Sequence, residues 1–117
     1  MSSTPDPDCL FCRIVAGDIP AEIVAETEHT VAFRDIFPQA DVHVLVVPRV
    51  HEPDIGSLAA ADPEVTVALL AEARRIAEVE VGGQYRLVFN TGSAAGQTVF
   101  HAHAHVLGGE IHVPLPG

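Results

Sequence analysis

The sequence predicts an α+β fold in which one long and one short helix pack against an antiparallel sheet of about five strands. Two observations favour this class: a single long stretch has helical apolar spacing, and several short β-branched runs are bounded by turn residues. The 117 residues suffice for one domain core but not for two. We expect residues 1–8 to form a flexible tail and residues 9–117 to form the single domain.

The first half of the chain is expected to supply the short helix and three strands. The helix is predicted over residues 10–16 and ends at Gly17, because glycine tolerates the left-handed conformation that ends a helix. Two short antiparallel strands are expected over residues 22–26 and 30–34. Residues 42–47 are almost all apolar, which is typical of a central strand covered on both faces.

The second half is expected to supply the long helix and two further strands. Asp62-Pro63 gives an N-cap and a proline at the first helical position, and Gly82-Gly83 ends the helix. We expect an apolar stripe of Val65, Leu69, Ala73 and Ile76, and a water-facing side of Glu72, Arg75 and Glu78. Strands are predicted over residues 85–90 and 99–107, joined by a loop of small residues at 91–97.

The composition disfavours several classes of partner. Six cationic side chains, all arginine, face sixteen Asp and Glu, giving a formal charge of −10. The lack of lysine excludes a Walker-type phosphate loop and Schiff-base chemistry, and few cations disfavour a nucleic-acid-binding face. No apolar run approaches the roughly 20 residues that span a bilayer, and residues 1–8 do not resemble a secretory signal. We therefore expect a cytoplasmic protein that binds neither nucleic acid nor membrane.

Three histidines recur at alternate positions near the end of the chain. In a strand, His101, His103 and His105 would project from one face, with neighbouring Cα atoms roughly 6.6 Å apart. Two neighbours can converge on one small group, but the outer two lie roughly 13 Å apart. Such a cluster can hold a metal or act on phosphorus. The loop before it, with Gln97 and Thr98 as side-chain donors, suits an anion and favours phosphoryl chemistry.

These residues resemble the histidine-triad family. Residues 101–107 match its signature, His-x-His-x-His followed by two apolar residues, and residues 96–99 match the segment before it. Further matches cover nearly the whole chain: 9–14, 17–20, 33–36, 38–40, His43, 48–51, Asn90 and 107–109. The Gly-Gly after the triad is most similar to the Hint-like branch, whose members hydrolyse purine nucleoside phosphoramidates and related aminoacyl adenylates as homodimers.

The resemblance implies a role for each polar residue of the site. His103 would attack the α-phosphorus and form a covalent nucleotidyl-histidine, which water then hydrolyses. His105 would bind the phosphate and help to protonate the leaving amine, and His43 would complete the site. Thr98 stands near the leaving group, where the branch often has serine. The phosphate oxygens would be held by Gly96, Gln97 and the Thr98 amide.

The nucleoside would be held by a second group of residues. By the same resemblance, Asp35 would accept hydrogen bonds from the ribose hydroxyls, and Asn90 would contact ribose or phosphate. The purine would lie between Phe11, Ile14, Ile19, Phe33 and Ile36. Periodicity alone would assign these apolar residues to the core.

The two cysteines suggest a metal site. A pair this close in a small intracellular protein is more often a metal half-site or a redox motif than a stabilising disulfide. Bacterial members of the family with the same CxxC often bind zinc, and the resemblance gives Cys9, Cys12, His51 and His101 as ligands. Two thiolates and two imidazoles complete a tetrahedral structural site. The alternative is a reduced pair packed in the core, with His101 bonded to the backbone.

The chain departs from the branch at its end. Relatives often finish with Trp-Pro-Pro-Gly, which reaches across the dimer, whereas residues 113–117 are Val-Pro-Leu-Pro-Gly and the chain has no tryptophan. We expect a more open site there. Alanine at positions 102 and 104, where larger aliphatic residues are frequent, implies closer packing behind the triad.

Two other functions stay open. The first is a dinucleoside polyphosphate hydrolase from another branch of the family, which shares residues 97–99 but usually lacks the Gly-Gly. The second is a nucleotide-binding scaffold with vestigial activity, which the intact His43, His103 and His105 argue against.

Overall fold

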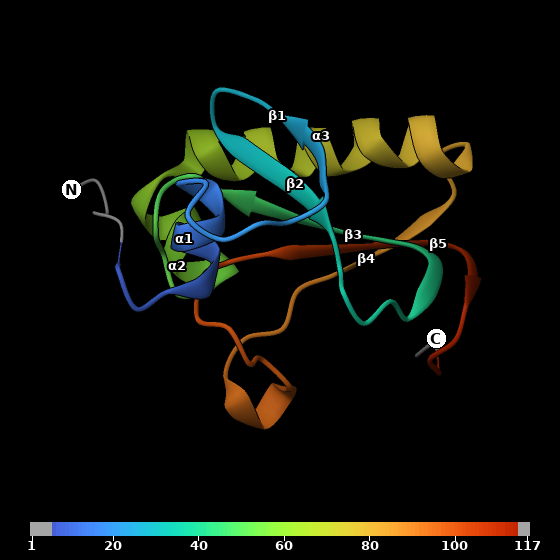
Figure 1. Cartoon of the computed structure of the whole chain (residues 1–117). Coiled ribbons are helices and arrows are strands. Elements are labelled where there is room, and N and C mark those ends of the chain that lie inside the picture. Colours follow the sequence, from blue (N-terminus) through green and yellow to red (C-terminus); the bar gives the residue numbers. More distant parts are fainter. Residues whose placement is uncertain (1–5, 115–117) are drawn as a thin grey trace.

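Residues 6–114 are described by a computed structural model, and they form a five-stranded antiparallel sheet with helices on both faces (Figure 1). The strand order is β1-β2-β3-β5-β4, so β3 is central. In chain order the elements are α1 (Leu10–Val15), β1 (Ile23–Glu26), β2 (Thr30–Arg34), β3 (Ala40–Pro48), α2 (Ile55–Ala61), α3 (Pro63–Val81), β4 (Tyr85–Val88), the 3₁₀ turn η1 (Ser93–Ala95) and β5 (Ala104–Ile111). The predicted α+β class is confirmed.

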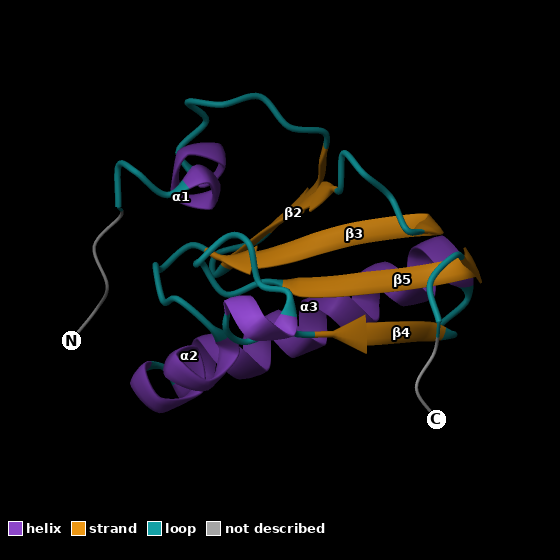
Figure 2. Cartoon of the chain, turned by 90° about the horizontal axis from the view of Figure 1, so that it is seen from below, coloured by secondary structure: helices purple, strands orange, loops and turns teal. Residues whose placement is uncertain are grey.

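The sheet separates two apolar clusters, with α2 and α3 on one side and α1 on the other (Figure 2). Val44 and Val46 of β3 pack in the α3 cluster, whereas Leu45 and Val47 pack in the α1 cluster. Side chains alternate between the two faces of a strand, so one apolar run serves both cores. Ala102 and Ala104 are fully buried on the α3 face.

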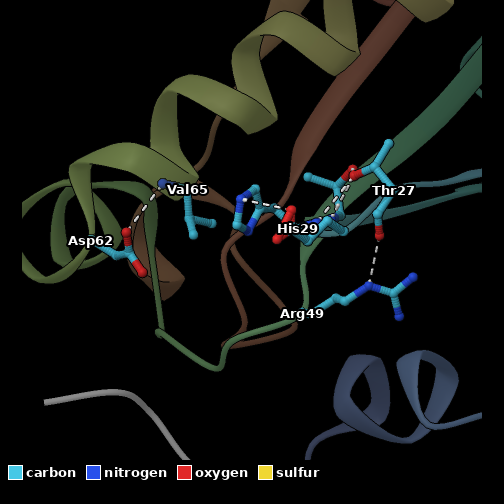
Figure 3. A network of polar contacts seen from close by, with 7 residues as sticks. Thr27, His29, Arg49, Asp62 and Val65 are labelled. Atoms are coloured by element: carbon cyan, nitrogen blue, oxygen red, sulfur yellow. Dashed lines mark hydrogen bonds and ion pairs between the residues drawn. The ribbon is translucent and has the colours of Figure 1, made fainter.

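The long helix begins and ends at the expected residues. The Asp62 side chain accepts a hydrogen bond from the Val65 N–H at 3.1 Å (Figure 3), and Gly82 ends the helix with a φ of 67°. The apolar stripe is buried. The expectation that Glu72 faces water is wrong, because its side chain is only 7% exposed. Arg75 neutralises the carboxylate with two hydrogen bonds of 2.7 and 2.8 Å, which lowers the cost of its burial.

One helix was not anticipated. The α2 helix starts at the N-cap Asp54, whose side chain accepts a hydrogen bond from the Ser57 N–H at 2.8 Å. Leu58 is its one fully buried side chain. A seven-residue helix with a single anchor has no apolar periodicity to reveal it. No helix within residues 6–114 is long and apolar enough to cross a membrane.

The last two strands differ from the prediction. The β4 strand ends at Val88 rather than at residue 90, and β5 begins at Ala104 rather than at residue 99. The segment before β5 leaves the sheet, because the Ala102 N–H donates to the Glu52 carbonyl at 2.7 Å. At its other end β5 runs on through Gly108, where a Cβ would lie 2.6 Å from Val81 of α3.

The turn between β1 and β2 is tied to the end of β3. Arg49 donates from Nε to the Thr27 carbonyl at 2.9 Å (Figure 3) and from its backbone N–H to the His29 carbonyl at 3.0 Å. The Thr27 hydroxyl accepts from the His29 N–H at 3.3 Å. These bonds fix the chain two residues before His51.

Candidate functional site

Two polar clusters lie side by side on the α1 side of the protein. One, here called the imidazole cluster, consists of His43, His103 and His105. The rings of His103 and His105 have centroids 4.9 Å apart, and those of His43 and His105 are 5.2 Å apart. The other, here called the thiol cluster, consists of Cys9, Cys12, His51 and His101. The three histidines of the signature are therefore divided between two sites.

The proton of His103 is placed by a backbone carbonyl. Its Nδ1 lies 2.8 Å from the carbonyl oxygen of His101. A carbonyl only accepts, so Nδ1 carries the hydrogen and Nε2 keeps its lone pair. Burial lowers the pKa of His103, although the bond to His101 and the nearby Asp35 act in the opposite direction. His103 is thus a neutral imidazole with a nucleophilic Nε2.

His43 has the opposite tautomer. Its Nδ1 accepts a hydrogen bond from the backbone N–H of Gln39 at 3.0 Å, so the proton of the neutral ring is on Nε2. This Nε2–H lies 3.0 Å from Nδ1 of His105 and 3.3 Å from a carboxylate oxygen of Asp35. Burial lowers the pKa of His43, which favours this neutral form.

His105 offers a free donor. Because its Nδ1 accepts from His43, its own hydrogen is on Nε2. Within residues 6–114, this buried Nε2 has no hydrogen-bond partner. Burial, together with the neighbouring His103 and His43, lowers the pKa of His105 to about 4. A buried donor without a partner is costly, which is consistent with a site for a ligand acceptor.

The carboxylate of Asp35 adjoins the imidazole cluster. One oxygen accepts from the Phe37 N–H at 2.8 Å, and the other faces His43. Asp35, His43 and His105 lie close enough together to suggest a second metal site. A cation on His43 Nε2 would require the proton on Nδ1, where it would face the Gln39 N–H. The tautomers therefore favour a hydrogen-bond chain over a metal at this position.

A cavity of about 450 Å³ opens beside the imidazole cluster. This size is within the range of small-molecule sites. Among its lining residues are seven with a predicted site role: Asp35, His43, Asn90, Gly96, Thr98, His103 and His105. Arg86, Phe37 and Gln39 also line it and were not anticipated. Arg86 is the one cation of the predicted 85–90 strand, which is the signal that could have marked it.

The end of the described chain also reaches this cavity. Val113 lines it, and Arg86 Nη1 donates to the Pro114 carbonyl at 3.2 Å. Residues 115–117, on which the expected openness of the site partly depends, lie outside the described residues, as do residues 1–5 of the expected tail.

In the loop before the triad, several of the expected phosphate donors already form hydrogen bonds within the protein. The Gln97 side chain accepts from the Gly92 N–H at 2.9 Å and donates to the carbonyls of Pro53 at 2.6 Å and Val99 at 3.0 Å. The backbone N–H groups of Gln97 and Gly96 donate to carbonyls within the loop. The donors of Gln97 are therefore already used, and its expected phosphate contact stays a prediction.

The predicted purine-binding residues are placed in different surroundings. Phe11 and Phe33 are buried in the α1 cluster with ring centroids 5.4 Å apart, and Ile14 packs partly against that cluster. Ile19 is half-buried, whereas Ile36 is 83% exposed beside Asp35. None of these five lines the 450 Å³ cavity.

The thiol cluster fits a tetrahedral metal ion. His51 Nδ1 lies 3.2 Å from His101 Nδ1 and 3.2 Å from the Cys12 sulfur, and His101 Nδ1 lies 3.4 Å from the Cys9 sulfur. Ligand separations of about 3.3–3.8 Å follow from zinc bond lengths in a tetrahedron. His101 Nε2–H donates to the Pro48 carbonyl at 2.8 Å, which leaves the Nδ1 lone pair facing the other three groups.

The protonation of the thiol cluster agrees with this fit. Burial lowers the pKa of His101 to about 4, so the ring is neutral and its lone pair is available. Burial raises the pKa of Cys12 to about 11, so its thiolate requires a bound cation at neutral pH. The two sulfurs accept from the backbone N–H groups of Cys12 and Asp6, at 3.3 and 3.4 Å. Hydrogen bonds from backbone N–H groups stabilise the negative charge of thiolates.

The fold and the site together define an α+β protein in which a neutral histidine with a free Nε2 lone pair lies beside a second histidine with a free N–H, at a cavity of small-molecule size. Residues 16–112 match the model of the HIT domain, and the chain belongs to the HIT family.

Relatives cover almost the whole chain. An uncharacterized HIT-like protein of Synechocystis is 43% identical over 111 residues, which are 94% of this chain and 97% of the relative. The purine nucleoside phosphoramidase of Escherichia coli is 36% identical over 110 residues, 92% of each chain. A HIT family hydrolase from Legionella pneumophila superposes with a TM-score of 0.86 at 43% identity, covering 94% of this chain and all (100%) of that one.

Proposed function

We propose that the protein is a nucleotide hydrolase that cleaves the P–N bond of purine nucleoside phosphoramidates and also hydrolyses related aminoacyl adenylates. The observation that carries this proposal is the pair of opposite tautomers: a lone pair on His103 Nε2 beside a free N–H on His105. The phosphoramidase of E. coli, at 36% identity, supports the substrate class.

The first step forms a covalent nucleotide on His103. Its Nε2 attacks the α-phosphorus, a new N–P bond forms, and the P–N bond to the amine breaks. The carbonyl of His101 stabilises the positive charge that develops on the ring through Nδ1–H. His105 Nε2–H donates to a phosphate oxygen or to the leaving nitrogen.

The leaving nitrogen needs a proton before it can depart as an amine. Neutral His105 holds a single hydrogen, so the extra proton is taken up from solvent when substrate binds. The negative phosphate raises the pKa of adjacent imidazoles and retains that proton in the complex. His105 delivers it, a task worth about 10²- to 10⁴-fold in rate. In the second step water attacks phosphorus, His105 accepts a proton from this water, the His103 N–P bond breaks, and the nucleotide leaves.

We assign the nucleoside contacts to the cavity rim. The Asp35 carboxylate would accept from the ribose hydroxyls, and Asn90 would contact ribose or phosphate. Their position in the cavity beside His103 supports this assignment. Thr98 lines the same cavity, and within residues 6–114 its N–H makes no hydrogen bond in the loop, so it could bind a phosphate oxygen.

A substrate panel tests the branch of the family. We expect hydrolysis of an adenosine phosphoramidate to exceed that of a diadenosine polyphosphate, and a covalent nucleotide to be located on His103 by mass spectrometry of a trapped reaction. A clear preference for the polyphosphate would identify the dinucleoside polyphosphate hydrolase instead. Nucleotide binding without turnover of either substrate would identify a scaffold.

We propose that the thiol cluster binds a structural zinc ion through Cys9, Cys12, His51 and His101. The converging lone pairs and the sulfur and nitrogen separations support it. Zinc would supply structural stability there rather than chemistry. Elemental analysis of protein purified without a metal-affinity tag should give about one zinc per chain, and Cys12→Ser should lower that content. A content well below one in the parent protein would refute the site.

We further propose that the protein is a cytoplasmic homodimer. The two free cysteines suit a reducing compartment, and the family resemblance implies the dimer. The β4 strand is an edge of the sheet and can extend it across a two-fold axis. Light scattering after size exclusion should give twice the 12.4 kDa chain mass, and the chain mass alone would refute the dimer.

A further inference from the structure

His101 belongs to both polar clusters at once. Its ring is fully buried in the thiol cluster, where Nδ1 faces Cys9, Cys12 and His51. Its backbone carbonyl, in contrast, is the acceptor that holds the Nδ1–H of His103 at 2.8 Å. One residue therefore contributes its side chain to the metal centre and its main chain to the nucleophile.

The segment that carries this carbonyl has little support from the sheet. His101 and His103 both precede β5, which begins at Ala104. Their backbone is joined instead to the loop after β3, through Ala102 N–H to the Glu52 carbonyl. The ring of His101 is joined to Pro48, the last residue of β3, directly before that loop. That loop also carries His51, so a cation held by both histidines would fasten the two segments together.

The short helix α1 makes a second connection. Phe11 lies between the two cysteines in sequence, and its ring packs edge-on against both His101 and His103, with centroid distances of 6.1 and 5.0 Å. The helix has six residues, too few to be stable without tertiary contacts. Binding of Cys9 and Cys12 to a metal would hold Phe11 against the nucleophile.

From these contacts we propose that His101 is a positioning residue through which metal occupancy fixes the tautomer and orientation of His103. When the four ligands are held together, the His101 carbonyl stays in place and keeps the hydrogen of His103 on Nδ1. When they are not, residues 101–103 gain freedom, and His103 exchanges to the form with hydrogen on Nε2. That form has no lone pair on the attacking nitrogen. The kinetic part of this inference rests on the proposed function, but the structural part does not.

Nitrogen NMR of the histidine rings tests the structural part without substrate. We expect zinc-loaded protein at one fixed neutral pH to hold His103 as the Nδ1–H tautomer, and chelator-stripped protein to contain a mixture that returns to one form when zinc is restored. Identical His103 spectra in the loaded and stripped proteins would overturn the proposal. So would a parent protein that binds no stoichiometric metal.

Cadmium substitution keeps the test decisive if stripped protein unfolds. Cadmium is larger than zinc and prefers the same ligand types, so the loaded protein should stay folded while its ligands move apart. We expect the His103 ring nitrogens to shift between the zinc and cadmium forms, while those of His112, which is bonded to neither cluster, do not. Equal His103 shifts in the two forms would contradict the coupling.

Single-turnover kinetics test the kinetic part. Stripping the metal should slow nucleotide transfer to His103 by about 10- to 100-fold, the usual effect of losing an outer-shell partner. The dissociation constant for AMP should change by less than about twofold, since the cavity-lining residues other than His103 are not altered. His51→Ala should reproduce the slowing, and His51→Cys, which keeps a ligand, should largely restore the rate. Equal rates in His51→Ala and the parent would overturn the kinetic claim.

The failures are distinguishable. If the protein does not hydrolyse phosphoramidates but its His103 tautomer follows metal occupancy, the proposed function fails and the positioning role of His101 stands. If it hydrolyses them but its His103 tautomer does not change with metal occupancy, the proposed function stands and the positioning role of His101 fails.

Discussion

The thiol cluster and the imidazole cluster are neighbours built largely from the same residue type, yet their chemistry differs. In the thiol cluster the lone pairs of His51 and His101 converge on one buried point. In the imidazole cluster the rings form a chain of donors and acceptors that ends in a free N–H on His105 beside an open cavity. The comparison teaches that backbone partners, more than residue type, determine what a histidine can do.

Loss of the nucleophile should have the largest effect. It should abolish the function of the imidazole cluster and leave the thiol cluster unchanged. We expect His103→Ala to lower kcat/KM by about 10⁴-fold or more, because no other group can form the covalent intermediate. Zinc content and Tm should stay close to those of the parent. Steady-state kinetics and elemental analysis on the same preparation give both readings, and turnover equal to the parent would remove His103 from the mechanism.

Loss of the free donor on His105 should have the second largest effect on activity. His105→Asn places its amide near the position of Nδ1 and loses the Nε2–H, so kcat should fall by about 10²- to 10⁴-fold. His105→Gln reaches further and keeps a donor near that position, and it should lose less. Single-turnover and steady-state rates of the two variants check the order. A larger loss in the glutamine variant would show that the free N–H is not the group that matters.

The hydrogen bond that sets the tautomer of His43 should have a smaller effect. Gln39→Pro removes only the backbone N–H that His43 accepts, and a lost bond of about 1.4 kcal/mol corresponds to about a tenfold fall in kcat/KM. Gln39→Ala retains this N–H and is the matched control. Kinetics with circular dichroism of both variants make the measurement. Equal activity in the proline and alanine variants would mean that the hydrogen-bond chain from Gln39 to His105 does not determine which nitrogen of His105 carries the hydrogen.

The smallest effect is expected in the dependence of stability on pH. In the metal-free protein, His101 and His105 have pKa values of about 4 when folded against an ordinary 6.5, so between these values the unfolded chain binds more protons than the folded chain. Stability must therefore fall as the pH drops from 6.5 towards 4, by up to about 1.4 kcal/mol per pH unit for each histidine.

Denaturant unfolding of chelator-stripped protein at several pH values between 7.5 and 4.5 measures this slope. His105→Gln should reduce it, since one of the two groups is removed. A stability that stays constant from pH 7 to pH 5 would show that these histidines are not held neutral by the fold.

Local signals in the sequence predicted most of the fold. Asp62 and Gly82 mark the ends of α3, and the nearly continuous apolar run of residues 42–47 places a covered strand at the centre of the sheet. The α2 helix was missed because Leu58 is its single buried anchor, and Glu72 was misplaced because its burial depends on the pair with Arg75. Both depend on contacts that periodicity does not register.

The site was predicted less completely than the fold. Spacing brought His103 and His105 together and resemblance added His43 and the four residues of the thiol cluster. Arg86 was missed, and the side-chain donors of Gln97 are already bonded to the carbonyls of Pro53 and Val99. Composition cannot show whether a polar group is already bonded, because its partners come from other segments.

The sequence by itself determined most of the elements and the proximity of His103 to His105, and its resemblance to the family indicated that two thiols lie near His101. Only the tertiary structure decided which nitrogen of each ring carries the hydrogen. The physical reason is that an imidazole has two nearly equivalent nitrogens, and the choice between them follows from the carbonyl or N–H that the folded backbone presents. Here the carbonyls of Pro48 and His101 and the N–H of Gln39 make that choice.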